Sequence, residues 1–245
     1  MNVGRDFAGV DITREPIHIK PGNHYVMGGV KTDTDGRTAV GGLYAAGEVA
    51  CVSVHGGNRL GANSLLDTLV FGRRSGQHAG HRAHAMAMPR ASEAIVDDER
   101  RALREVLARE QRGRRISELK AELGAVMDKH VAVFRNEEGL GEALEVVRRL
   151  KQESATVATD DKGTVFNQDV LGVLELGFML DNAEAIVLGA IERKESRGAQ
   201  YRSDHPERND EDWLKHITVS RDGDEPDISY SEVTLTQWQP EERKY

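Results

Sequence analysis

The residue types best able to do chemistry lie between residues 42 and 67. The first part of this stretch, residues 42–48, reads GLYAAGE, so that Glu48 follows a short apolar strand. An acidic residue at the end of a strand is well placed to accept hydrogen bonds from ribose hydroxyls, as in dinucleotide-binding folds. This placement of Glu48 favours a nucleotide cofactor.

The second part, residues 53–67, reads SVHGGNRLGANSLLD. It places His55 and Arg59 in a glycine-rich loop, and Asn63 or Ser64 can cap the helix that follows. Free backbone N–H groups at a helix start can stabilise an electron-rich ring oxygen or a phosphate. The spacing alone also fits a simpler interpretation, in which Glu48 caps a neighbouring segment and the glycines only turn the chain.

Both parts closely resemble the segment with which the flavoprotein subunits of succinate dehydrogenase and fumarate reductase hold FAD. The family pattern is Gly-Leu-(Tyr/Phe)-Ala-x-Gly-Glu, followed by Ser-Val-His-Gly-x-Asn-Arg-Leu-Gly-x-Asn-Ser-Leu-Leu-Asp. The resemblance implies that Glu48 binds the FAD ribose and that Arg59 grips a substrate carboxylate. It implies further FAD contacts from the loop and the helix start, at His55, Asn63, Ser64 and Leu65.

Upstream, residues 24–29 read HYVMGG, which resembles the family's His-Tyr-x-Met-Gly-Gly. By this resemblance His24 contacts the dicarboxylate substrate. A planar arginine suits a carboxylate fork, and a histidine can donate a second charge-assisted hydrogen bond. We therefore expect His24 and Arg59 to bind the substrate together.

The resemblance continues through the second half of the chain. Residues 133–140 (VFRNEEGL) and 195–206 (ESRGAQYRSDHP) are similar to the helical part of the same subunits, with Gln200 in place of the usual histidine. It implies a subunit that oxidises succinate to fumarate, or the reverse, and that passes electrons to an iron–sulfur subunit held by membrane-anchor subunits. A cytoplasmic location follows, peripheral on the cytoplasmic face of the inner membrane through those partners.

Several of the family's functional features are not among these 245 residues. They are the Gly-x-Gly-x-x-Gly fingerprint, the histidine of the covalent flavin link and the arginine that delivers the proton. Because binding without an acid–base partner only positions a substrate, we expect no catalytic residue in this chain and no activity from the chain alone. Two alternatives remain open: a fragment of L-aspartate oxidase, and a noncatalytic module that docks the iron–sulfur subunit.

The elements that must position these residues are strands and tight loops in the first third of the chain. Glycine pairs between residues 22 and 80 disfavour helices there. Short buried strands are predicted at 25–27 and 43–46, with hairpin-turn chemistry at 33–36. A helix is predicted from about residue 63, where apolar residues recur at helical spacing.

Farther along the chain the pattern becomes helical. A charged amphipathic segment opens at residue 97, and three helices are predicted near 116–130, 140–153 and 167–194. These helices are expected to pack on one another.

The tail from residue 203 is polar and predicts a β-hairpin, with strands at 218–220 and 230–238. We predict an α+β fold of three parts. They are the C-terminal portion of a capping and FAD-binding α/β domain (1–88), a helical-bundle domain (89–203) and an extended tail with a β-hairpin (204–245).

The composition narrows the class of protein further. Charged residues make up 30% of the chain and aromatic residues 5%, a balance that favours helix surface over a β-sandwich. The net charge of -8 argues against binding nucleic acid, which needs clustered Lys and Arg. The single cysteine, Cys51, cannot form an internal disulfide, and one thiol is too few for an iron–sulfur cluster or a zinc site. No metal is predicted.

Overall fold

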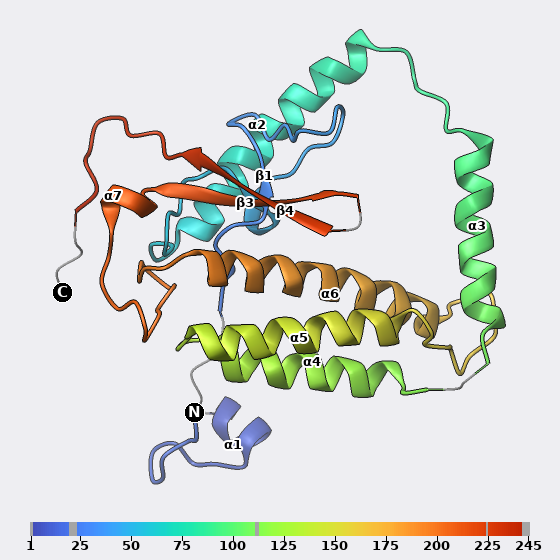
Figure 1. Cartoon of the computed structure of the whole chain (residues 1–245), viewed down its shortest axis with the longest axis horizontal. Coiled ribbons are helices and arrows are strands. Elements are labelled where there is room, and N and C mark those ends of the chain that lie inside the picture. The colour runs from blue at the N-terminus through green and yellow to red at the C-terminus, as the bar shows by residue number, and fades with distance from the viewer. Residues whose placement is uncertain (1, 20–23, 111–112, 224, 242–245) are drawn as a thin grey trace.

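A computed structural model of the chain describes residues 2–19, 24–110, 113–223 and 225–241 (Figure 1). Residues 242–245, in the predicted tail, and residues 20–23, just before His24, therefore lie outside the described residues. Helices and a few short strands together confirm the α+β class. In chain order, the elements are α1 (Asn2–Ala8), β1 (Val30–Lys31), η1 (Gly47–Val49), β2 (Ala50–Cys51), α2 (Asn63–Ala85), α3 (Glu93–Ala108), α4 (Ile116–His130), α5 (Glu137–Ser154), α6 (Gln168–Glu192), α7 (Asp210–Trp213), β3 (Lys215–Asp222) and β4 (Glu225–Glu232).

The first sheet is a short parallel pair, in which Val30 of β1 faces Ala50 of β2. The strands predicted at 25–27 and 43–46 are therefore wrong, because both ladders form a few residues downstream. The Val26 N–H group donates to the Glu48 carboxylate at 3.1 Å instead of to a neighbouring strand.

The turn predicted at 33–36 is confirmed. The Gly36 N–H group donates to the Asp33 carbonyl at 3.0 Å, and the Asp33 carboxylate accepts from the Arg37 side chain at 2.5 Å. Tyr44, in the second predicted strand, forms only an isolated antiparallel bridge with Arg37.

Helix α2 begins at Asn63, as predicted, and packs against η1 and the 33–36 turn. A Cβ atom at Gly36 would lie 2.7 Å from the Ser75 side chain, so only glycine lets the turn approach the helix this closely. Several apolar side chains of α2 nevertheless face solvent, among them Leu65 at 71% and Leu69 at 72% exposure.

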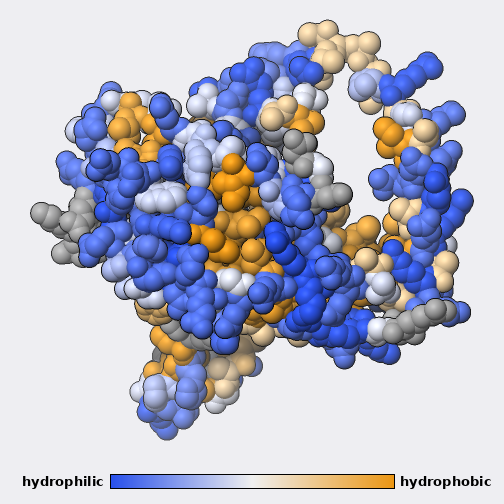
Figure 2. Space-filling view, viewed as in Figure 1, coloured by the Kyte–Doolittle hydropathy of each residue, from blue (hydrophilic) through white to orange (hydrophobic). Residues whose placement is uncertain are grey.

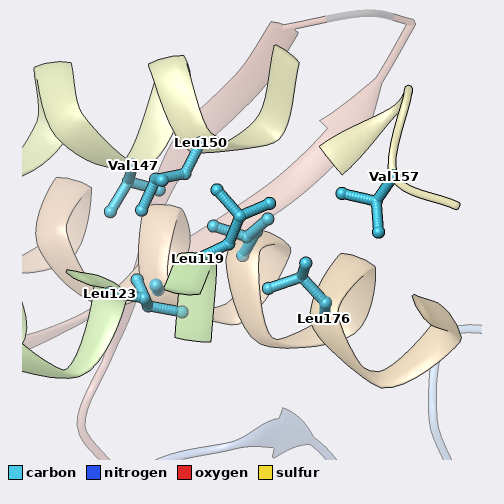
Figure 3. Packing of buried hydrophobic residues seen from close by; sticks show 8 residues of the cluster. Leu119, Leu123, Val147, Leu150, Val157 and Leu176 are labelled. Atoms are coloured by element: carbon cyan, nitrogen blue, oxygen red, sulfur yellow. The ribbon is translucent and has the colours of Figure 1, made fainter. Parts of the chain in front are cut away.

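Helices α4, α5 and α6 pack as a bundle around the main core, part of which Figure 3 shows. The predicted helices near 116–130, 140–153 and 167–194 are confirmed, and asparagine side chains fix two of their starts. Asn136 accepts from the Gly139 N–H group at 2.8 Å, and Asn167 accepts from the Val170 N–H group at 3.0 Å. Core residues of α5 and α6 recur every three or four positions: Leu140, Ala143, Val147 and Leu150, then Leu176, Leu180, Ala183, Val187 and Ala190.

Helix α3 stands at one side of the molecule, and an extended segment joins it to α2 (Figure 1). Its C-terminal end reaches the bundle, where Val106 is buried and Arg109 donates to the Val157 carbonyl at 3.1 Å. No helix among the described residues is long and apolar enough to cross a bilayer.

Strands β3 and β4 form the antiparallel hairpin, with Ile217 opposite Tyr230. The first strand was predicted in place, but the second runs from Glu225 to Glu232, so its prediction at 230–238 is wrong in both bounds. The hairpin lies between the bundle and the β1 region (Figure 1). Figure 2 shows hydrophobic residues at the centre of this face, surrounded by hydrophilic ones.

Two side-chain contacts join the hairpin to the first third of the chain. Ser53 Oγ lies 2.8 Å from His216 Nε2, and Lys31 donates to Ser231 Oγ at 3.0 Å. The hairpin therefore connects the helical bundle to the segment that carries the predicted site residues.

Candidate functional site

The glycine-rich loop between β2 and α2 brings Arg59 onto the ring of Tyr25. The guanidinium carbon lies 4.6 Å from the ring centroid, and Nη1 donates to the Leu60 carbonyl at 3.0 Å. A guanidinium over an aromatic face is attracted by the ring's quadrupole, which helps to hold Arg59 at this position. Within the described residues Arg59 Nε is buried without a hydrogen-bond partner.

His55, from the same loop, lies between Tyr25 and a buried carboxylate of α2. Its Nε2 atom is 3.2 Å from Asp67 Oδ2 and 3.4 Å from the Tyr25 hydroxyl. Because a carboxylate accepts hydrogen bonds, we assign the ring proton to Nε2, which leaves a lone pair on Nδ1. Nδ1 is also buried with no partner in the described part of the chain.

Tyr25 stays protonated in this setting. Burial raises the pKa of its hydroxyl, and the nearby charges of Asp67 and Glu48 raise it further, against a smaller opposite effect of Arg59. Tyr25 therefore acts as a neutral platform, and its hydroxyl donates to the Asp67 carboxylate of α2.

Glu48 lies in η1 and is exposed. Its Oε1 atom accepts from the Val26 N–H group, one residue beyond Tyr25. An ionised carboxylate has about four acceptor positions, so this bond orients Glu48 and leaves capacity for ligand hydroxyls.

The N-terminus of α2 has no side-chain cap, and the expectation that Asn63 or Ser64 caps it is wrong. The N-cap residue is Ala62, in a left-handed conformation at φ 63°, because the chain turns tightly there and the Asn63 N–H group donates back to the Leu60 carbonyl at 3.2 Å. The helix start is thus open to an electron-rich group at Ser64, whereas the Leu65 N–H group already donates to the Ala62 carbonyl at 3.2 Å.

Some of the predicted site residues lie close together in the structure, and others do not. Arg59 and His55 meet on Tyr25, and Glu48 is tied to the same segment by Val26. His24 is exposed, and the described contacts reach its neighbour Tyr25 rather than His24 itself.

Two residues of this cluster, Tyr25 and Asp67, were not predicted as site residues. Both lie within the quoted motifs, and Asp67 follows Asn63 by four positions, which turns it back toward the helix start. That spacing was the available signal, whereas the pairing with His55 needed the folded loop.

Comparisons with known proteins place both halves of the chain. Residues 120–245 match the family model described as fumarate reductase flavoprotein C-term, and residues 2–65 match one described as FAD binding domain.

The relatives are flavoprotein subunits of fumarate reductase and of succinate dehydrogenase. A fumarate reductase flavoprotein subunit from Mycobacterium tuberculosis (strain ATCC 25618 / H37Rv) is 42% identical over 98% of this chain and 42% of that protein. A succinate dehydrogenase flavoprotein subunit from Rickettsia conorii is 39% identical over 94% of this chain and 40% of that protein.

Among solved structures, a quinol fumarate reductase from Escherichia coli superposes with a TM-score of 0.90 at 34% identity. The match covers 98% of this chain and 42% of that one. The chain thus spans about two fifths of the length of the relatives it matches.

Proposed function

The chain belongs to the succinate dehydrogenase and fumarate reductase flavoprotein family, and we propose that it forms part of the FAD-containing subunit that interconverts succinate and fumarate. The observation that carries the proposal is the cluster at the open start of α2, where Arg59 lies on Tyr25 beside His55. Each group there has a polar atom or a charge available to a ligand.

The residues present fit FAD. His55 Nδ1 is a buried polar atom without a partner in the described chain, which is costly unless a bound group satisfies it. Glu48 would accept from the ribose hydroxyls, and the start of α2, at Asn63, Ser64 and Leu65, would face the electron-rich edge of the flavin ring.

The dicarboxylate would bind through Arg59 and His24. The Arg59 guanidinium lies over the Tyr25 ring at 4.6 Å, and its planar fork suits a bidentate contact with one carboxylate. His24 is exposed one residue before Tyr25 and would donate to the substrate from the same segment. The bound flavin supplies the redox chemistry, while these side chains bind and orient the substrate; we assign no proton-transfer residue to this chain.

The whole subunit would pass its electrons to an iron–sulfur subunit, next to membrane-anchor subunits on the cytoplasmic face of the inner membrane. The match to a fumarate reductase flavoprotein, and the superposition on a quinol fumarate reductase, support the iron–sulfur and membrane partners in this proposal. We also keep the division into parts at 1–88, 89–203 and 204–245 as a proposal. In it the first part carries the ligand-binding residues, and the other two carry the bundle and the hairpin.

The test is a visible-absorbance titration of the purified chain with FAD, with and without malonate or fumarate. The titration is repeated with the chain mixed with a polypeptide that covers the remaining length of the relatives. We expect FAD to bind in at least the second case and the dicarboxylate to shift the flavin band.

Arg59→Lys should bind FAD but lose most of the shift, and Arg101→Lys, on the exposed face of α3, is the matched control that should keep it. Absence of flavin binding in both preparations would overturn the proposal.

A further inference from the structure

Glu195 is a fully buried carboxylate outside the cluster just described, with 0% exposure. Four hydrogen bonds reach it: Arg193 and Arg197 Nε donate to Oε1 at 2.6 and 2.7 Å, and Arg197 Nη2 and the Asn209 N–H group donate to Oε2 at 3.0 and 2.9 Å. Burial opposes its ionisation, but the bonds from Arg197, Asn209 and Arg193 outweigh burial and lower its pKa. Glu195 is therefore an anion that holds Arg193, Arg197 and the Asn209 backbone in place.

The arginine that Glu195 holds begins a tight turn. Arg197 and Gln200 exchange backbone hydrogen bonds at 2.7 and 3.0 Å, and Gly198 between them has φ +60°. The same Nη2 atom of Arg197 that donates to Glu195 also donates to Asp210 at 2.6 Å. Two carboxylates thus hold the Arg197 guanidinium, which fixes the turn relative to Glu195.

This turn is in direct backbone contact with the loop that carries Arg59. The Ala199 N–H group donates to the Gly57 carbonyl at 2.8 Å, two residues before Arg59. A Cβ atom at Gly198 would lie 2.2 Å from the same carbonyl oxygen, and one at Gly57 would lie 3.0 Å from Arg197. The two backbones therefore meet at a distance that only glycine permits.

We propose that Glu195 is a positioning residue for Arg59, acting through the turn at Arg197 and Gly198 and the hydrogen bond between Ala199 and Gly57. The inference rests on the proposed function, in which Arg59 binds the dicarboxylate. Glu195 touches neither ligand. Through the turn, Glu195 fixes the position of the loop at Gly57. The position of the loop in turn determines where the Arg59 guanidinium lies on Tyr25.

The first test measures Arg59 itself and needs no ligand. The full-length chain and its variants react with phenylglyoxal, and mass spectrometry of the peptide that contains Arg59 gives the rate. We expect Glu195→Gln and Gly198→Ala to raise this rate about fivefold, the ratio that corresponds to ~1 kcal/mol for one lost hydrogen bond.

Glu184→Gln is the matched control. Glu184 is also a buried carboxylate with two basic partners, Arg148 and Lys151, but it lies in α6 away from the loop. Its variant should leave the Arg59 rate unchanged. If Glu195→Gln does not fold, Gly198→Ala decides, because it keeps Glu195 and its partners. Folded variants with the control's Arg59 rate would overturn the inference.

A second measurement separates positioning from general destabilisation. With FAD bound, Glu195→Gln should weaken malonate binding about fivefold or more, while FAD affinity changes less than about twofold. Equal losses for both ligands would count against a role aimed at Arg59. If the unmodified chain with FAD does not bind malonate, the proposed function is rejected instead. The phenylglyoxal rates would still decide whether Glu195 positions Arg59.

Discussion

The carboxylate of Asp67 holds the imidazole of His55 from the first turns of α2, with 3.2 Å between Oδ2 and Nε2. Asp67 is 5% exposed, so water does not compete for this contact. A buried carboxylate on one ring nitrogen fixes the tautomer, and the other nitrogen is thereby prepared to accept a hydrogen bond. The helix thus determines the chemistry of a side chain in the preceding loop.

Removing this carboxylate should destabilise the chain. Asp67→Ala leaves His55 Nε2 and the Tyr25 hydroxyl without their buried partner, and we expect a loss of about 1–3 kcal/mol in unfolding free energy from urea titrations. Asp97→Ala is the control, since Asp97 forms only an exposed pair with Arg100 and should cost less than about 0.5 kcal/mol. Equal losses for the two variants would contradict the structural role of Asp67.

Arg59→Lys tests the fork rather than the charge. Lysine keeps the positive charge but presents no bidentate plane, so malonate affinity should fall by about tenfold or more, with FAD affinity nearly unchanged. The flavin-band titration measures both constants. An unchanged malonate constant would mean that Arg59 contributes only its charge.

Gly29 should be essential to the β1–β2 pair. It has φ +128°, and a Cβ atom there would lie 2.3 Å from the Val49 carbonyl oxygen. Gly29→Ala should therefore lower the exchange protection of the Thr32 amide, which donates to the Cys51 carbonyl, by about fivefold or more. Gly41→Ala, in open space, is the control, and equal protection in both variants would argue against the steric explanation.

His216 should make stability depend on pH. Burial lowers its pKa below the ordinary value of 6.5, and the positive charges of Lys31 and Arg193 lower it further. Below pH 6.5 the unfolded chain then binds more protons at this residue than the folded chain, so stability falls as pH decreases through 6.5 and is unaffected above it. The melting temperature should drop more between pH 7.5 and 5.5 in the native chain than in His216→Gln. Parallel pH curves would exclude the effect.

The bundle core should respond to a cavity. Leu176 is 0% exposed, and Leu176→Ala should lower the unfolding free energy by about 2–5 kcal/mol. Leu174→Ala, two residues earlier at 39% exposure, should cost less than about 1 kcal/mol. Urea titrations followed by far-UV circular dichroism give both values, and a similar cost at the two positions would contradict the packing described for α6.

The bundle could be predicted from sequence because its signals are local. The helices at Glu137–Ser154 and Gln168–Glu192 follow apolar stripes and asparagine caps that lie within a few residues of one another. The two-residue strands β1 and β2 could not be placed, because their positions depend on pairing across the Asp33 turn and on Glu48 binding Val26. Helix α1 was not predicted either; it is short and has no apolar stripe.

The candidate site was predictable as a set of residues but not as a geometry. Motif resemblance pointed to Arg59 and Glu48, whereas the Tyr25 platform arises where separate segments meet. Glu195 shows the same limit more strongly. Its link to the loop depends on a hydrogen bond between Ala199 and Gly57, which no local pattern encodes.

The contacts of the Arg59 loop with the C-terminal region also imply an order of folding. Ser53 meets His216 across 163 residues, and Gly57 meets the turn at Ala199. During synthesis, at about 5–20 residues per second, the bundle helices can form from nearby contacts while these distant partners are still absent. The loop at Arg59 therefore reaches its final shape only after residues 199 and 216 have left the ribosome.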